Sequence, residues 1–284
     1  MNQYSESFGA TAKRGFMNLP IAIRTIIGIN TVVFLVQLLA GLFGLGGLLT
    51  SIFAFVPSFP EALYQPWRII TYMFFHSTSG IFHYLFNMLW LWWMGKPVEE
   101  RMGPRSFTVL YMGAGIGGAL LDLLIGSFTG IPPVIGASGA VFGVMVGFAM
   151  LFPRLPIMLF LLPPVEARYV VTGMIAINVL FLGARDNVSQ LVHLGGAFSG
   201  YLIMKAYSGG FDLSSVIRPI ENFLKAFKPV RKAPKHMRKV EDVEIVEEVE
   251  QSELDEILEK ISKKGYDGLT KEEKQKLFEL SKKN

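Results

Sequence analysis

The stretch Gly136-Ala137-Ser138-Gly139-Ala140-Val141-Phe142-Gly143 opens a long apolar segment and places a single hydroxyl among glycines. Serine is common in membrane-spanning helices as a small packing residue, so packing is the default interpretation of Ser138. A second glycine-rich apolar segment, 192–200, contains His193. Whether Ser138 does chemistry therefore depends on whether the fold brings these two segments together.

The composition divides the 284-residue chain into an apolar part and a polar part. Apolar residues dominate from about Pro20 to Lys205, whereas Ser208–Asn284 is strongly polar, which is typical of a polytopic membrane protein with a soluble tail. The absence of cysteine excludes disulfides and a thiol nucleophile. The net charge of +4 is more typical of topology signals in loops than of a nucleic-acid surface, and we expect no nucleic-acid partner.

Six apolar segments can cross the ~30 Å hydrocarbon layer as helices, if the shorter ones pack inside the bundle. They lie near 21–43, 82–96, 106–126, 136–152, 167–184 and 189–207. The apolar run 155–162 is bracketed by prolines and would reach only about 12 Å as a helix, so we interpret it as an interfacial loop. The sequence therefore predicts an all-α bundle of six transmembrane helices.

The flanking segments complete the predicted domain organisation. It consists of a cytoplasmic N-terminal segment (1–20), a six-helix membrane domain (21–207), a charged linker (208–251) and a small soluble helical hairpin (252–284). In the hairpin, Ser252 with Asp255 and Thr270 with Glu273 have the spacing of helix-capping pairs. The basic run Lys228–Lys239 follows the last span, so anionic membrane lipids are expected partners.

The positive residues predict the orientation, because cytoplasmic loops are enriched in lysine and arginine. With six spans both termini share one side, which also holds Lys13, Arg14, Lys96, Arg101, Arg105, Arg154, Arg168 and the run 228–239. We expect that side to be cytoplasmic. The second, fourth and sixth spans then run inward from the outer face, so the polar residues near their starts share one depth: His83, Asn87, Ser138 and His193.

Ser138 and His193 have surroundings that would suit a nucleophile and its base. A site at the start of a helix offers backbone N–H groups to a developing oxyanion. Ser138 lies about 100° from the glycine stripe of its own helix, so the sequence permits a Ser–His hydrogen bond without requiring it. Small residues that let backbones approach closely recur at helical spacing: Gly139, Gly143 and Gly147 on one span, and Gly196 and Gly200 on the other.

His83 and Asn87 are four residues apart and hence on one helix face, where both can donate hydrogen bonds. Two interpretations remain open, since the pair could hold helices together or stabilise the oxyanion of an acyl transfer. Either Asp122 or Asp186 could orient His193, so the residues themselves support only a Ser–His dyad. The histidines lack the spacing of a metal site, and we expect neither a metal nor another cofactor.

These residues resemble the motifs of the rhomboid family of intramembrane serine proteases over about residues 20–207. Five short motifs occur in the order and at the membrane depths that the family shows, which makes the resemblance specific. They are Trp67 with Arg68 (WR), His83 with Asn87 (HxxxN), Gly95 with Glu99 and Gly103 (GxxxExxxG), Gly136 with Ser138 and Gly139 (GxSG), and His193 with Gly196 and Gly200 (HxxGxxxG). The tail resembles a hairpin that follows some bacterial rhomboid cores.

The resemblance implies a serine endopeptidase that hydrolyses a peptide bond in or near the transmembrane segment of single-span membrane proteins. It implies that Ser138 is the nucleophile and His193 the general base, while His83 and Asn87 stabilise the oxyanion with the Ser138 backbone. The implied location is a cell membrane, namely the inner membrane of a bacterium. Two alternatives remain: a catalytically silent rhomboid-like scaffold that binds transmembrane helices, and a small transporter or channel.

Glu99 lies at the predicted cytoplasmic end of the second span, close in sequence to two arginines. We expect it to fix a loop or helix end by ion pairing with Arg101 and Arg105.

Overall fold

The structure is a computed structural model that describes residues 14–128, 132–158, 163–182, 190–226 and 255–281. It divides into two compact units, Met1–Ala226 and Phe227–Asn284, which are described separately. After a short helix at 14–17, the first unit contains α2 (Ile21–Leu42), α3 (Gly46–Phe53), α4 (Phe59–Tyr64), α5 (Arg68–Thr71), the 3-10 helix η1 (Tyr72–Phe74), α6 (Ile81–Met102), α7 (Pro104–Gly126), α8 (Ser138–Leu151), β1 (Pro156–Ile157), β2 (Val165–Glu166), α9 (Ala167–Leu180), α10 (Gln190–Ser208) and α11 (Ser214–Ala226).

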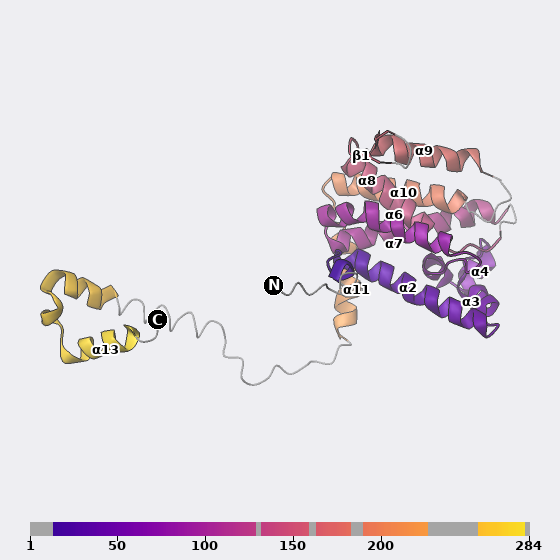
Figure 1. The fold of residues 1–284 in the computed structure, drawn as a ribbon. Helices are drawn as coiled ribbons and strands as arrows, with labels where there is room; N and C mark the ends of the chain where they lie inside the picture. The colour runs from indigo at the N-terminus through magenta and orange to yellow at the C-terminus, as the bar shows by residue number, and fades with distance from the viewer. Residues whose placement is uncertain (1–13, 129–131, 159–162, 183–189, 227–254, 282–284) are drawn as a thin grey trace, which may run out of the picture. The chain divides into compact units, whose positions relative to one another are not determined.

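The six predicted spans correspond to α2, α6, α7, α8, α9 and α10, which run alongside one another in Figure 1. Among the described residues, α2 and α7 are long and apolar enough to cross a bilayer by themselves, whereas α8 and α9 are shorter apolar helices. A shorter helix suits the interior of a bundle, where other helices cover it. The predicted all-α fold is therefore confirmed.

α8 is the central helix of the bundle. It contacts α6, α7, α9 and α10, and every residue from Gly139 to Phe148 is buried. Its sequence is apolar on all sides, which is the pattern of a helix without a solvent face. Because α8 begins at Ser138, the most enclosed helix of the unit starts at the hydroxyl that the sequence singles out.

The structure differs from the predicted elements at the end of the second span and in the interfacial loop. α6 continues past residue 96 to Met102 with Pro97 inside it, and Gly103, with φ +77°, separates it from α7. A proline removes one backbone donor and disfavours helix interiors, but the helix here continues through it. In the predicted interfacial loop, β1 pairs with β2 in antiparallel register, while residues 159–162 lie outside the described part.

Glu99 fixes a helix end by a different interaction from the predicted ion pair with Arg101 and Arg105. Its carboxylate is buried, and its two oxygens accept hydrogen bonds from the backbone N–H groups of Ala22 and Ile23, both at 2.8 Å. The first N–H groups of a helix lack partners within that helix and carry its positive dipole end. Glu99 therefore caps α2 and joins α2 to the end of α6.

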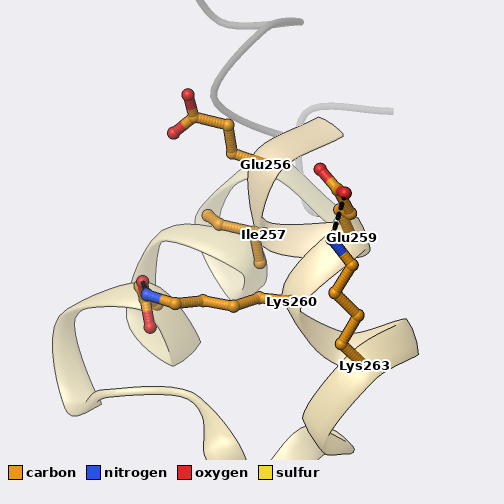
Figure 2. Close-up of a pocket in the computed structure, with 6 residues that line it drawn as sticks. Glu256, Ile257, Glu259, Lys260 and Lys263 are labelled. Carbon is orange, nitrogen blue, oxygen red and sulfur yellow. Dashed lines mark hydrogen bonds and ion pairs between the residues drawn. The ribbon is translucent and has the colours of Figure 1, made fainter.

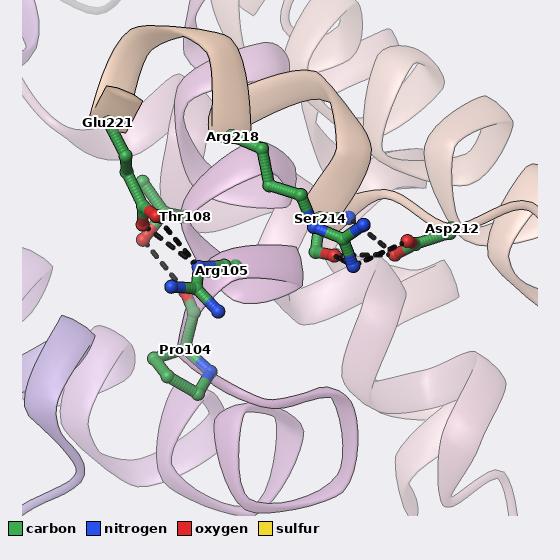
Figure 3. Close-up of polar contacts among 7 residues, drawn as sticks. All are labelled: Pro104, Arg105, Thr108, Asp212, Ser214, Arg218 and Glu221. Atoms are coloured by element: carbon green, nitrogen blue, oxygen red, sulfur yellow. Dashed lines mark hydrogen bonds and ion pairs between the residues drawn. The ribbon is translucent and has the colours of Figure 1, made fainter. Parts of the chain in front are cut away.

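The beginning of the predicted charged linker is a helix attached to the bundle (Figure 3). Arg105, in the first turn of α7, donates from Nε to both carboxylate oxygens of Glu221 at 2.9 and 3.0 Å. Arg218 donates to Asp212 and Ser214, each at 2.9 Å. The Arg105–Glu221 pair therefore joins α11 to the start of α7, whereas the bonds of Arg218 stabilise the first turns of α11.

The second unit contains a helix at 255–264, a 3-10 turn (Tyr266–Gly268) and α13 (Lys271–Ser281). Thr270 and Glu273 make the predicted capping pair: Thr270 N–H donates to Glu273 Oε2 at 2.8 Å, and Glu273 N–H donates to Thr270 Oγ1 at 3.3 Å. The predicted cap at Ser252 lies outside the described residues.

A pocket of this second unit is lined by charged side chains and by buried Ile257 (Figure 2). Lys260 Nζ donates to Glu273 Oε1 at 2.5 Å, and Lys263 Nζ donates to Glu259 Oε1 at the same distance. The hydrogen bonds from the Lys260 ammonium and from the Thr270 N–H hold the pKa of the Glu273 carboxyl below its ordinary value. Four of the charged side chains that line the pocket therefore form two ion pairs, Lys260–Glu273 and Lys263–Glu259.

Candidate active site

α8 and α10 cross in direct backbone contact at four glycines. A Cβ on Gly196 would lie 2.0 Å from the carbonyl oxygen of Gly139, and a Cβ on Gly200 would lie 2.5 Å from the Cα of Gly143. Any larger side chain at these positions would force the helices apart, because real Cβ atoms do not come so close to other atoms. The predicted glycine stripes therefore meet one another.

A neighbouring face of α10 packs equally closely against α7. A Cβ on Gly118 would lie 2.6 Å from the carbonyl oxygen of Val192, and one on Gly117 would lie 1.8 Å from Ser199 Oγ. This contact of α7 is not among the predicted ones, although the small residues of the run 113–118 indicate a face that allows close helix packing. Fixed on two sides, α10 has little freedom to slide or rotate.

This crossing brings Ser138 and His193 together. Ser138 Oγ and His193 Nε2 are 2.7 Å apart, which is hydrogen-bonding distance. The ring of Phe142, one turn after Ser138, stacks on the imidazole with 4.6 Å between centroids and 11° between planes. Although Ser138 lies at the edge of the glycine stripe, it is close enough to α10 for its hydroxyl to contact His193.

The other nitrogen of His193 contacts a residue that the sequence analysis does not identify. Asn178 Oδ1, on α9, lies 2.7 Å from His193 Nδ1. Of the two predicted alternatives, Asp122 is fully buried in α7 and Asp186 lies outside the described residues. The available signal was the polarity of Asn178 within a predicted span, since a strongly polar side chain there requires a partner.

Gly136 shapes the approach to Ser138. Its φ of +134° lies in the region that side chains rarely adopt, and a Cβ would be 3.0 Å from both Cε1 and Nε2 of His83. The Gly136 N–H donates to Tyr72 O at 2.9 Å, and two backbone hydrogen bonds join Phe55 to Val134. The α3–η1 segment (residues 46–74) therefore holds the loop before α8 in place.

His83 faces this loop with its Nε2 atom, and the hydrogen bond at Nδ1 determines the tautomer of the ring. Its Nδ1 accepts a 3.4 Å hydrogen bond from the Ser77 N–H, so in the neutral ring the proton resides on Nε2, the nitrogen beside Gly136. Asn87 is buried one turn later, and its Nδ2 donates to the His83 carbonyl oxygen at 2.7 Å. The structure thus brings His83 to the loop before Ser138, with Asn87 bonded behind it.

Trp67 and Arg68 stabilise the α3–η1 segment through hydrogen bonds to its backbone rather than to the Ser–His pair. Trp67 Nε1 donates to Ile52 O at 3.1 Å, and Arg68 donates to the carbonyl oxygen of Ser51. Thr71 Oγ1 makes a similar bond to Phe53 O at 3.0 Å. Together these bonds tie α5 to the end of α3.

The assembled groups have the chemistry of acyl transfer. Ser138 offers a hydroxyl bonded to an imidazole, and it occupies the first position of a helix, where backbone N–H groups lack intrahelical partners and the helix dipole is positive. A negative oxygen that forms beside Ser138 would be stabilised there. Fold and site together define a helical bundle with a partly buried serine–histidine pair.

A model of the rhomboid domain matches residues 64–209, just over half of the chain, and the chain belongs to the rhomboid family. It is therefore a polytopic helical membrane protein, as the sequence predicts. Residues 247–283 match a model described as a family of unknown function.

Curated relatives share the central part of this chain. It is similar to RHOMBOID-like protein 1 of Arabidopsis thaliana (37% identity over 49% of this chain and 34% of the relative). It is also similar to the rhomboid protease GluP (33% over 49% and 26%) and the putative rhomboid protease YdcA (30% over 48% and 65%), both of Bacillus subtilis. The chain thus spans between about a quarter and two thirds of the length of these relatives.

The glycine crossing makes a prediction about stability. Gly196→Ala places a methyl group against the Gly139 carbonyl, so we expect the free energy of unfolding in detergent to fall by about 1–3 kcal/mol, the usual cost of overpacking. Gly173→Ala is the matched control, because its Cβ would meet no atom within 4 Å among the described residues. Equal unfolding free energies for the two variants would contradict the observed crossing.

Proposed function

We propose that this protein is an intramembrane serine endopeptidase that hydrolyses a peptide bond in or near the transmembrane segment of membrane proteins. The observation that carries the proposal is the 2.7 Å contact between Ser138 Oγ and His193 Nε2 at the start of the central helix. The relatives from Bacillus subtilis, which are named rhomboid proteases, support it.

In the first step, His193 Nε2 takes the proton from Ser138 Oγ as that oxygen attacks the substrate carbonyl carbon. The carbonyl oxygen becomes an oxyanion, and the imidazolium then gives its proton to the leaving amine as the peptide C–N bond breaks. A water molecule, deprotonated by the same imidazole, attacks the resulting acyl-serine ester. Release of the new carboxyl group restores the Ser138 hydroxyl.

The oxyanion is stabilised by donors at the start of α8 and by His83. The Ser138 backbone N–H belongs to the positive end of the helix, and His83 Nε2–H lies beside Gly136. Asn87 contributes through its bond to the His83 carbonyl and through the second hydrogen of its carboxamide. Such donors act on charge that develops only in the transition state.

The substrate class follows from the location of the site within a bundle of membrane helices. The peptide bonds of a membrane helix are shielded by its own hydrogen bonds, so cleavage requires local unwinding and favours helix-weakening residues near the cut. We infer that the substrates are single-span membrane proteins that approach through the surrounding lipid. The charge distribution supports an orientation with both termini in the cytoplasm, and we propose a bacterial inner membrane as the location.

Replacement of either member of the dyad should abolish cleavage. With a model single-span substrate and purified full-length protein, we expect Ser138→Ala and His193→Ala to reduce kcat by at least about 10⁴-fold, because each removes the nucleophile or its base. Ser127→Ala is the control, since its hydroxyl donates to Leu123 O one turn earlier in the chain, and it should cleave normally.

Retained cleavage by purified Ser138→Ala protein would exclude the proposed mechanism. If the wild-type protein binds transmembrane helices and cuts none, the scaffold alternative is supported instead. Flux that depends on His83 and Asn87, without cleavage, would support a transporter or channel.

The oxyanion role of His83 has a separate kinetic signature. His83→Ala should lower kcat about 100- to 1000-fold with little change in KM, because the lost hydrogen bond forms only in the transition state. Tyr84→Phe is the matched control on the same helix, where the hydroxyl bonds to Thr31 Oγ1 at 2.6 Å; its kcat should stay near wild type. A wild-type kcat for His83→Ala would assign the oxyanion to other donors.

A further inference from the structure

Asn178 joins α9 to the candidate catalytic pair through both ends of its carboxamide. Nδ2 donates to the Met174 carbonyl oxygen at 2.9 Å, and Oδ1 lies 2.7 Å from His193 Nδ1. We propose that Asn178 is a positioning residue that holds His193 in the tautomer and orientation needed to accept the proton of Ser138. This inference rests on the proposed function and adds a third helix to the site.

The hydrogen-bond chemistry determines where each proton lies. The Met174 carbonyl can only accept, so it must face the amide nitrogen of Asn178, and the amide oxygen must then face His193. That oxygen also can only accept, so His193 Nδ1 carries a proton. In a neutral imidazole the other nitrogen, Nε2, then has the lone pair, and it is the atom 2.7 Å from Ser138 Oγ.

Two contacts fix the imidazole in complementary ways. The stacked ring of Phe142 sets its plane, whereas the bond to Asn178 sets its rotation within that plane and its protonated edge. When the ring takes the proton of Ser138, the bond from Nδ1 becomes charge-assisted and strengthens. A neutral amide does this without placing a second charge among apolar helices, where burial of an ion is costly.

A role in helix packing alone would also explain an amide at this position, but it predicts different kinetics. Leucine has the same branching and the same number of side-chain heavy atoms as asparagine but no acceptor, whereas aspartate keeps the acceptor oxygen and loses the bond to Met174. Positioning therefore predicts that Asn178→Asp is more active than Asn178→Leu. Packing predicts the reverse order, since leucine suits an apolar contact better than a carboxylate.

The test measures cleavage of a model single-span substrate by the full chain in detergent. We expect Asn178→Leu to lower kcat about 10- to 100-fold with KM within about twofold, and Asn178→Asp to stay within about tenfold of wild type. Val179→Leu is the matched control, because this neighbour on α9 is half exposed and should leave kcat unchanged. A wild-type kcat for Asn178→Leu would overturn the proposal.

Nitrogen-15 NMR of histidine-labelled protein gives a readout that packing would not move. The signal of His193, identified by its loss in His193→Ala, should show a protonated Nδ1 in the wild type and a mixture of tautomers in Asn178→Leu. A wild-type ring protonated on Nε2 would overturn the proposal even if activity fell.

The two proposals fail separately. Cleavage by Ser138→Ala would remove the proposed function, whereas full activity of Asn178→Leu beside an inactive Ser138→Ala would remove only the role of Asn178. If the wild type cleaves no substrate, the NMR measurement still tests the tautomer.

Discussion

The backbone contact between α8 and α10 is the constraint on which the site depends. Gly139 and Gly196 touch without intervening side chains. Gly139 directly follows Ser138, and Gly196 lies one turn after His193. Because helices are stiff, fixing this one crossing also fixes the separation of Ser138 and His193 at a hydrogen bond. Sequestration in the bundle then strengthens each polar interaction, since the surroundings screen charges weakly. The glycines carry no reactive group themselves; their close contact sets the distance between Ser138 and His193.

Other parts of the chain support this crossing from outside. α7 confines α10 on its second side through Gly117 and Gly118. The α3–η1 segment holds the loop before α8 through the two Phe55–Val134 backbone hydrogen bonds, and His83 lies against Gly136 of this loop. At the other end of α6, Glu99 caps α2. The geometry of the Ser–His pair therefore depends on several helices of the bundle, and α9 contacts His193 through the side chain of Asn178.

Much of this arrangement could be predicted from the sequence, because hydrophobic length and charge asymmetry are strong signals in membrane proteins. The six helices and the common depth of His83, Asn87, Ser138 and His193 followed from counting spans and their direction. Rotation about each helix axis is weakly specified, so the contact of Ser138 with His193 was only permitted, and Asn178 was missed in favour of acidic residues. Glu99 was assigned to arginines near it in sequence, whereas its partners are the backbone groups of a helix distant in sequence, which no local pattern indicates.

The most direct test of the account is a site-mapped reaction of the full chain with a fluorophosphonate, followed by mass spectrometry of its peptides. A serine hydroxyl becomes a strong nucleophile only when an adjacent base accepts its proton. The account predicts one adduct, on Ser138, and its loss in His193→Ala. An unmodified Ser138 in the wild-type protein, or equal modification of Ser138 in His193→Ala, would contradict the claim that the α8–α10 contact assembles a reactive pair.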